Sequence, residues 1–261
     1  MRALYTSATG MMAQQFNLDV IANNLANVNT NGYKLSTANF QDLLYQNLRT
    51  PGAISGNGGQ LPTGSQVGLG VNAGTTNQIF TQGTLQPTGN DYDLAIKGDG
   101  FFKVLMPDGT NSYTRDGAFD IDSQGRLCTS DGFPVQPEII VPADKTSITI
   151  APDGTVSVTR AGQTSMQQIG QLQLTRFINP SGLLDLGGNL YKNTPASGDP
   201  IDDTPGQNGL GTIVQKTLET SNVQIVEEMI KMITAQRSYE TNSKAVQAAD
   251  QMLSTANNLK Q

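Results

Sequence analysis

Aspartates are the side chains of this sequence best suited to bind a metal ion or to move a proton. Asp91, Asp93 and Asp99 lie close together, but the glycine and closing glutamate of a calcium-binding loop do not follow them. Paired carboxylates can also hydrolyse glycosidic bonds, in a cleft lined by aromatic side chains. We predict no metal site, because the calcium-loop residues are missing, and no glycosidase, because the sequence contains no Trp.

A glycine-rich run and a single thiol are the other candidates for chemistry. The third glycine of residues 68–74 stands at the wrong spacing for a dinucleotide-binding turn. Cys128 has no second cysteine to pair with, and we expect a buried, inert thiol. The sequence has no His, the usual general base and the commonest metal ligand. These features predict a protein that is not an enzyme and that binds no cofactor.

Composition argues against two classes of partner. The 261 residues carry a net charge of −6 without a basic cluster, so nucleic acid is not expected as a partner. No run approaches the roughly 18 consecutive apolar residues of a membrane span, so membrane insertion is not expected. Polar residues interrupt the stretch from Leu4 to Gln15, which predicts that any export proceeds without a cleaved signal peptide.

The C-terminal end is predicted to be a long amphipathic helix. From Thr220 to Gln261 there is no Gly or Pro, and Ser221 with Gln224 fits a capping box. Apolar positions then recur at steps of four and three, with polar interruptions, as in a coiled coil. These positions include Ile225, Met229, Met232, Tyr239, Val246 and Leu253. A second apolar row, formed by Val226, Ile230 and Ile233, indicates contact with more than one neighbour.

The N-terminal end repeats this pattern. Its positions at steps of four and three are Leu4, Ala8, Met11, Gln15, Leu18, Ala22 and Leu25. Such a helix is marginal alone in water, and Gly10 weakens it by roughly 1 kcal/mol, so it needs packing from elsewhere. An asparagine-rich stretch that includes Asn27 leads to a helix stop at Asn31-Gly32. Its amides have two open interpretations: fixing register against a neighbouring chain, or capping and solvation.

The periodicity changes to two between residues 82 and 187. Short alternating segments predict strands, and they include 93–96, 101–105, 118–121, 147–150 and 156–159. Asp-Gly turns, which favour hairpins, separate several of them, as at Asp108-Gly109 and Asp153-Gly154. The middle of the chain is therefore predicted to be an antiparallel β domain.

Glycine- and proline-rich connectors flank the β domain. The first includes residues 50–70, predicted to be irregular and either flexible or ordered against another subunit. The residues predicted to stiffen it are Pro51, Gly52, Gly59, Pro62 and Gly64. Just before it, apolar residues from Phe40 to Arg49 predict one more short helix.

The predicted fold class is α+β. Paired N- and C-terminal helices form a coiled-coil-like domain, and an antiparallel all-β domain is inserted between them on Gly-rich connectors. The predicted boundaries are residues 1–33 and 216–261 for the terminal helical polymerisation domain, 34–81 and 188–215 for the connectors, and 82–187 for the β domain. Since the ends are too weakly apolar to be satisfied within one molecule, we expect identical neighbours to order them.

Four motifs, in order along the whole chain, resemble those of the flagellar rod and hook axial proteins. Residues 21–34 (Ile21 to Lys34) are similar to the N-terminal signature of that family, and residues 219–245 resemble the paired C-terminal signature. Residues 96–102 and 113–117 resemble its β-domain motifs. The length and the glycine-rich insert are most similar to those of a distal rod subunit.

The resemblance implies a structural subunit of the bacterial flagellar distal rod. Such a subunit self-assembles into a hollow, rigid drive shaft that transmits torque from motor to hook. The implied location is the basal body, with the rod crossing the periplasm to the outer membrane. The implied partners are further copies of the chain, proximal rod proteins, the hook protein, the L- and P-ring bushing and the flagellar type III export apparatus. The candidate subunit-interface residues are Leu4, Met11, Leu18, Leu25, Asn27, Ile225, Met229, Ile233, Tyr239, Val246 and Leu253.

Two alternatives stay open at this stage. The chain could instead be a hook or proximal rod subunit of the same axial family. An unrelated binding module, with its β domain on a coiled-coil stalk, would form discrete helical oligomers in dilute solution.

Overall fold

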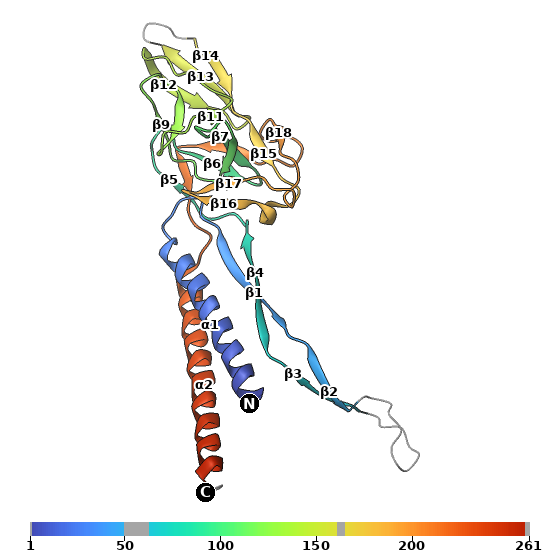
Figure 1. Cartoon of the computed structure of the whole chain (residues 1–261). Helices are drawn as coiled ribbons and strands as arrows, with labels where there is room; N and C mark the ends of the chain where they lie inside the picture. The colour runs from blue at the N-terminus through green and yellow to red at the C-terminus, as the bar shows by residue number, and fades with distance from the viewer. Residues whose placement is uncertain (1, 50–62, 161–164, 259–261) are drawn as a thin grey trace. The chain divides into compact units, whose positions relative to one another are not determined.

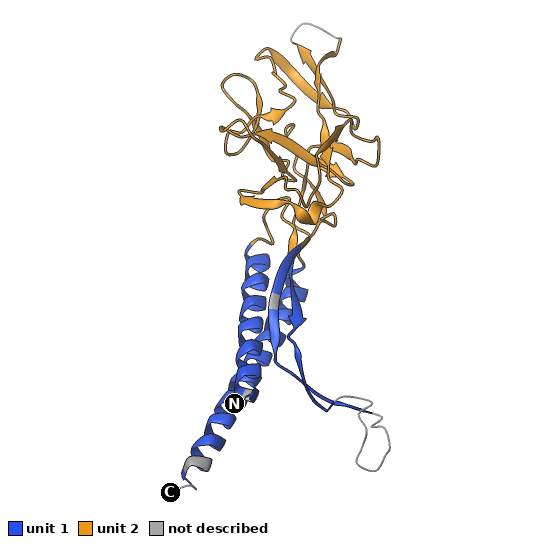
Figure 2. Ribbon diagram, turned by 45° about the vertical axis from the view of Figure 1, so that its right-hand side comes forward, with its two compact units in different colours: residues 1–26, 36–77, 224–261 blue, residues 27–35, 78–223 orange. Residues whose placement is uncertain are grey.

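The protein divides into two compact units. Its structure, a computed structural model, describes residues 2–49, 63–160 and 165–258. Unit 1 comprises residues 1–26, 36–77 and 224–261, and unit 2 comprises residues 27–35 and 78–223 (Figure 2). The predicted α+β class is confirmed, since two terminal helices enclose an antiparallel β domain in the sequence. Residues 188–215, predicted as a connector, belong to unit 2 and contribute strands to it.

Both predicted terminal helices are present in unit 1. Helix α1 spans Arg2–Ala26 and helix α2 spans Ile225–Asn258. They lie side by side and run in opposite directions (Figure 1). The helix stop predicted after α1 is confirmed: Gly32 adopts a left-handed φ of 67° that favours glycine.

The predicted capping box of α2 is wrong, because the helix begins four residues later than Ser221. The Ser221 hydroxyl accepts a hydrogen bond from the Val223 N–H at 3.2 Å, which closes a local turn. Asn222 is held by unit 2, since its amide donates to Ile79 O at 2.9 Å and its oxygen accepts from Leu35 N at 2.7 Å. These bonds hold the chain out of the helical path.

Four strands complete unit 1. They are β1 (Leu35–Asp42), β2 (Tyr45–Arg49), β3 (Ser65–Gly68) and β4 (Val71–Ile79). β1 pairs with β4, and β2 pairs with β3 in an antiparallel ribbon (Figure 1).

The helix predicted from Phe40 to Arg49 is therefore wrong. Its apolar side chains are mostly exposed, Leu44 by 82%. A helix in this region would therefore have no buried apolar face to stabilise it. Backbone pairing with residues 65–68 satisfies the polar groups instead. The same pairing shows that residues 65–68 are not irregular. Gly64 is exposed just before β3, whereas Pro51, Gly52, Gly59 and Pro62 lie outside the described residues.

Unit 2 is built from short strands. They are β5 (Leu85–Pro87), β6 (Leu94–Lys97), β7 (Phe101–Leu105), β8 (Asn111–Thr114), β9 (Phe119–Ile121), β10 (Leu127–Thr129), β11 (Val135–Gln136), β12 (Lys145–Ile150), β13 (Thr155–Arg160), β14 (Gln167–Gln171), β15 (Leu174–Arg176), β16 (Leu184–Gly187), β17 (Leu190–Lys192), β18 (Ile201–Asp203), β19 (Thr212–Gln215) and β20 (Thr217–Glu219), with a 3-10 turn η1 (Pro180–Gly182). Its largest sheet has the order β16-β17-β8-β7-β15-β18, with β11 also against β7. A three-stranded sheet, β12-β13-β14, and the pairs β6–β19, β5–β20 and β9–β10 complete the unit.

Asp-Gly turns join neighbouring strands as predicted. Gly109 between β7 and β8 has φ of 79°, and Gly154 between β12 and β13 has φ of 82°. The Asp108 carboxylate accepts the Thr110 N–H at 2.9 Å, and Asp153 accepts the Thr155 N–H at the same distance. A left-handed glycine after an aspartate that closes its own turn explains these hairpins.

The core of unit 2 follows from the two-residue period. On β7, Phe102 and Val104 are fully buried in the main apolar cluster, together with Leu94, Ile96 and Leu174. The alternate residue Phe101 joins a second, aromatic cluster. Cys128 is buried, as predicted, and burial raises the pKa of its thiol, which disfavours the reactive thiolate.

Candidate subunit interface

Asp93, one of the candidates for chemistry, has a structural role. The Asp93 carboxylate accepts hydrogen bonds from Thr88 Oγ1 at 2.5 Å and from Asn90 Nδ2 at 3.0 Å. Across residues 2–49, 63–160 and 165–258, no group of three or more His, Cys, Asp or Glu side chains could hold a metal ion. Within the same residues, no helix is long and apolar enough to cross a membrane.

The inner seam of the helix pair is narrow and built from small residues. Ala13 and Ile21 of α1 are buried, as is Ala235 of α2. At Gly10 the helices approach so closely that an added Cβ would lie 3.0 Å from the Asn242 amide nitrogen. Gly10 lowers the stability of α1 as an isolated helix, but its lack of a side chain permits this close packing.

A polar clamp formed by Asn24, Ser36 and Glu228 fixes the register of unit 1. The Asn24 amide donates to Ser36 O at 2.8 Å and to Glu228 Oε2 at 3.2 Å. Its oxygen accepts the Ser36 N–H at 3.0 Å. One side chain thus connects α1, β1 and α2.

Sequence reasoning missed this clamp. Within the same clamp, the buried Glu228 also binds Lys231 Nζ at 2.6 Å. The asparagine-rich stretch was the available pattern, but Asn24 connects segments of one chain, and register-fixing against a neighbouring chain stays a prediction. Asn27 shows the other interpretation, local capping, because Thr30 Oγ1 donates to its side-chain oxygen at 3.2 Å in a local turn.

The candidate interface residues of the two helices differ in exposure. In α1, Leu4, Met11, Leu18 and Leu25 are half-buried. In α2, Val246 is half-buried, but the other candidates are exposed: Ile225, Met229, Ile233, Tyr239 and Leu253.

A continuous apolar face of α2 therefore remains uncovered. It consists of Ile225, Val226, Met229, Ile230 and Ile233, and Val226 is 70% exposed. The positions that α1 covers, Glu228 and Ala235, each precede by one residue a position of the predicted four-and-three pattern, Met229 and the polar Gln236. One residue is a rotation of about 100° around a helix. The predicted seam and the seam used within the chain are therefore different faces.

Unit 2 has a buried ion cluster that sequence analysis did not single out. Glu219 binds Lys34 Nζ at 2.5 Å and Arg115 Nε at 2.7 Å, and all three side chains are at most 5% exposed. Gly83 N–H donates to the same carboxylate at 2.8 Å, and Gly32 N–H donates to the Glu219 carbonyl at 2.8 Å. The cluster fastens the first and last segments of unit 2 to its sheets.

The charges of this cluster are interdependent. Burial by itself raises the pKa of Glu219, but Arg115 and Lys34 outweigh burial and hold that pKa below its ordinary value of 4.5. Glu219 is therefore ionised in the folded state at neutral pH. Removing one partner would leave a buried charge unpaired.

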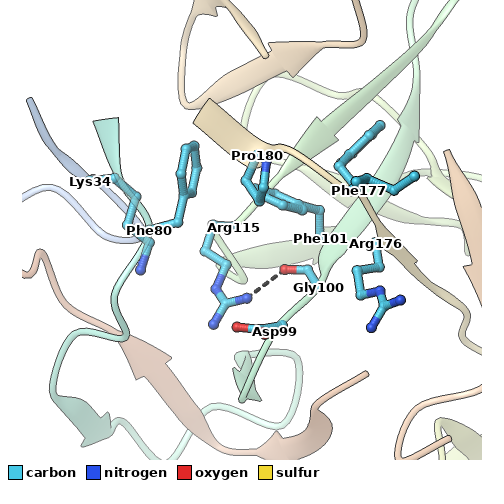
Figure 3. Close-up of a pocket in the computed structure, with 10 residues that line it drawn as sticks. Lys34, Phe80, Asp99, Gly100, Phe101, Arg115, Arg176, Phe177 and Pro180 are labelled. Atoms are coloured by element: carbon cyan, nitrogen blue, oxygen red, sulfur yellow. Dashed lines mark hydrogen bonds between the residues drawn. The ribbon is translucent and has the colours of Figure 1, made fainter. Parts of the chain in front are cut away.

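A pocket of about 380 Å³ lies beside the cluster in unit 2 (Figure 3). Lys34 and Arg115 reach it from the cluster, and Arg176 reaches it from β15. Its aromatic wall includes Phe80, Phe101 and Phe177. Phe101 packs edge to face on the other two rings, at centroid distances of 5.5 and 5.8 Å. The wall is thus held in a fixed shape.

Comparison with known families matches three models in order along the chain. The model described as "Flagella basal body rod protein" matches residues 4–34. "Flagellar hook protein FlgE/F/G D1 domain" matches residues 95–158, and "Flagellar basal body rod FlgEFG protein C-terminal" matches residues 214–259.

Relatives match over nearly the full length. The chain is 51% identical over 251 residues to the flagellar basal-body rod protein FlgG of Buchnera aphidicola (subspecies Acyrthosiphon pisum), covering 96% of each. It is 51% identical over 262 residues to FlgG of Borreliella burgdorferi, covering 100% of this chain and 99% of the relative. A solved structure of the Helicobacter pylori flagellar hook protein FlgE2 matches at 14% identity and a TM-score of 0.25, covering 64% of this chain and 48% of that one.

Proposed function

The chain belongs to the flagellar basal-body rod protein family and is a structural subunit of the distal rod, and we propose that its copies self-assemble into a hollow, rigid shaft that transmits torque from the motor to the hook. The observation that carries this proposal is the uncovered apolar face of α2. Val226 and Ile230 are 70% and 57% exposed although each lies on a long ordered helix.

Exposed apolar rows on a helix favour burial against another chain. Fully burying a side chain of this size contributes about 1.5–3 kcal/mol relative to leaving it exposed. Contiguous exposed apolar surface on a soluble protein commonly marks an interaction site. An identical helix pair is a suitable partner, because repeated head-to-tail contacts of one subunit with the next build a helical polymer.

The connector is proposed to brace neighbouring copies and so stiffen the shaft. Strand β2 and the residues before it expose Leu44, Tyr45 and Leu48. Exposed apolar side chains on a two-stranded ribbon have no core of their own to enter, since two strands alone are marginally stable. The stiffening residues Pro51, Gly52, Gly59, Pro62 and Gly64 remain part of this proposal.

The proposal extends to partners and location. The partners are proximal rod proteins, the hook protein, the surrounding L- and P-ring bushing and the flagellar export apparatus. The subunit is exported without a cleaved signal peptide, and the rod crosses the periplasm to the outer membrane. We propose a structural role without catalysis, nucleic-acid binding or membrane insertion.

Assembly of purified protein, followed by electron microscopy, tests the polymer. Ile230→Asp places a charge on the exposed face, and deletion of Met252–Gln261 removes the end of α2. Both are expected to prevent rod formation while circular dichroism shows unit 2 still folded. Leu25→Asp is expected to do the same from α1. Thr234→Asp, at an exposed polar position of α2, is the matched control and should assemble. Full-length rods from the three variants would refute the interface.

A second experiment separates the distal rod from the alternative, a hook or proximal rod subunit of the same axial family. Deletion of residues 52–70 is expected to cost a distal rod its straightness, because the bracing connector is lost. Straight rods from the deleted protein would contradict the bracing role and favour the alternative.

A further inference from the structure

The pocket of unit 2 contains a cation, Arg176, for which the described residues supply no hydrogen-bond or ion-pair partner (Figure 3). Lys34 and Arg115 are paired with Glu219, and Arg115 also donates to Gly100 O at 2.5 Å. The guanidinium of the half-buried Arg176 makes no hydrogen bond or ion pair with any residue that the structure describes. A guanidinium has five N–H donors, so Arg176 is able to donate hydrogen bonds to a carboxylate.

The remaining wall suits an apolar neighbour of that carboxylate. Figure 3 shows the rings of Phe80 and Phe177 above the charged ends of Arg115, Asp99 and Arg176. Ile178 contributes to the same pocket and is 79% exposed. The volume of about 380 Å³ lies at the small end of the roughly 300–1,000 Å³ range of ligand pockets. It is large enough for a few side chains from another protein.

We propose that this pocket receives an acidic side chain and an adjacent apolar side chain from a second copy of the chain, with Arg176 binding the carboxylate. The proposal rests on the polymer described above and adds a specific contact between β domains to it. Charge complementarity favours a second copy: the chain has 22 acidic and 16 basic residues, so each copy offers carboxylates in excess. The like net charge of −6 also opposes association.

A cation without a partner of its own lessens that repulsion at the contact. The nearby Asp99 carboxylate repels an incoming acid. A carboxylate can therefore bind only in the part of the pocket next to Arg176. A planar, two-pronged pairing at that position would fix orientation as well as add affinity.

Charge reversal at Arg176 tests the proposal. Arg176→Glu is expected to raise the protein concentration needed for polymerisation at least about tenfold, because it sets two acids against each other. Arg176→Lys keeps the charge and should change the concentration needed for polymerisation by less than about threefold. Lys192→Glu, the same reversal on β17 of unit 2, is the control and should polymerise like the unchanged protein.

The fold of each variant is checked by its thermal unfolding. Since the Arg176 guanidinium has no partner among the described residues, each Arg176 variant should have the unfolding temperature of the unchanged protein. If Arg176→Glu unfolds instead, Arg176→Gln replaces it, with a smaller increase expected in the same concentration. Normal polymerisation of Arg176→Glu, or of Arg176→Gln where it replaces that variant, would overturn the pocket contact.

Photo-crosslinking identifies the occupant independently. A benzophenone amino acid in place of Ile178 is expected to crosslink to a second copy in purified polymer and not in monomer. Polymers without an intermolecular crosslink, or a crosslink formed only after ring or hook protein is added, would refute a second copy as occupant. If the unchanged protein forms no polymer, the proposed function fails; if both it and Arg176→Glu polymerise, only this inference fails.

Discussion

The two units differ in where they place their large apolar side chains. In unit 2, Leu94, Ile96 and Phe102 are completely inaccessible, each within a cluster assembled from several strands. In unit 1, α2 leaves Val226 and Ile230 more than half exposed, although the helix is long and well formed. Sheets that pack around one another cover both the ends and the faces of their strands. Two helices cover only one stripe of each other.

This difference indicates two sources of order. Because unit 2 buries its large apolar side chains internally, we expect it to fold without another chain. Unit 1 is positioned by a narrow seam around Ala13 and Ala235 and by the polar clamp of Asn24, Ser36 and Glu228. A second apolar face of α2 stays exposed, and we propose that a neighbouring copy covers it. The comparison predicts that substitutions affect folding in one unit and assembly in the other.

The largest expected effect is on the core of unit 2. Phe102→Ala removes a fully buried ring that packs edge to face on Phe119 at 5.0 Å. It should lower the free energy of unfolding by about 3–5 kcal/mol, measured by urea denaturation. Met229→Ala on the exposed face of α2 is the matched control and should change it by less than about 0.5 kcal/mol. Equal losses in the two variants would remove the contrast between the units.

A slightly smaller loss is expected at the ion cluster. Glu219→Gln leaves Lys34 and Arg115 buried without their anion and should cost about 3 kcal/mol. Lys103→Met breaks the half-exposed Lys103–Asp202 pair, whose side chains are 23% and 31% exposed, and should cost about 1 kcal/mol or less. A cost for Glu219→Gln as small as that of the control would show that the cluster does not hold unit 2 together.

The same cluster predicts a pH dependence. Because the pKa of Glu219 is lowered in the folded state, its contribution is complete above its ordinary pKa of 4.5 and is lost as pH falls through the lower, folded pKa. Unfolding free energies of Glu219→Gln and the unchanged protein should therefore converge as pH falls below 4.5. A constant difference between pH 7 and the acid limit of folding would contradict the assignment.

The clamp of unit 1 should give an intermediate effect. Asn24→Leu leaves the Ser36 N–H and the Glu228 carboxylate without the Asn24 partner and should cost about 1–3 kcal/mol. Amide hydrogen exchange at Ser36 should accelerate, while exchange at Phe102 stays slow. Gln15→Leu, at an exposed position of α1, should leave both rates unchanged.

The smallest effect on folding is expected on the uncovered face of α2. Ile230→Ser should shift the unfolding free energy of the monomer by less than about 0.5 kcal/mol, since the side chain is 57% exposed. The same substitution should slow polymer growth, followed by light scattering, because the lost apolar area belongs to the proposed contact between copies. A large loss of monomer stability would place Ile230 in a fold contact instead.

Local patterns predicted much of the fold. Steps of four and three gave α1 and α2, and alternation with Asp108-Gly109 and Asp153-Gly154 turns gave the hairpins of unit 2. These succeed because hydrophobic period and turn chemistry act within a few residues. The start of α2 and the region from Phe40 to Arg49 were wrong for the opposite reason. At the start of α2, Asn222 is bound by Leu35 and Ile79, which are distant in the sequence. Residues 45–49 pair with residues 65–68 on a separate strand.

By itself, the sequence determined that the chain has two amphipathic ends around a β domain, and it supplied the motifs that relate it to flagellar rod proteins. Only the tertiary structure decided which face each helix turns inward. The two adjacent apolar rows at the start of α2 both remain exposed, and the face turned toward α1, with Glu228 and Ala235, is neither of them. The choice depends on Asn24, Glu228 and the small residues at the closest approach, whose contacts form only after distant segments meet. Arg176 was found in the same way, because the lack of a partner among the described residues is a property of the tertiary structure and not of the sequence pattern.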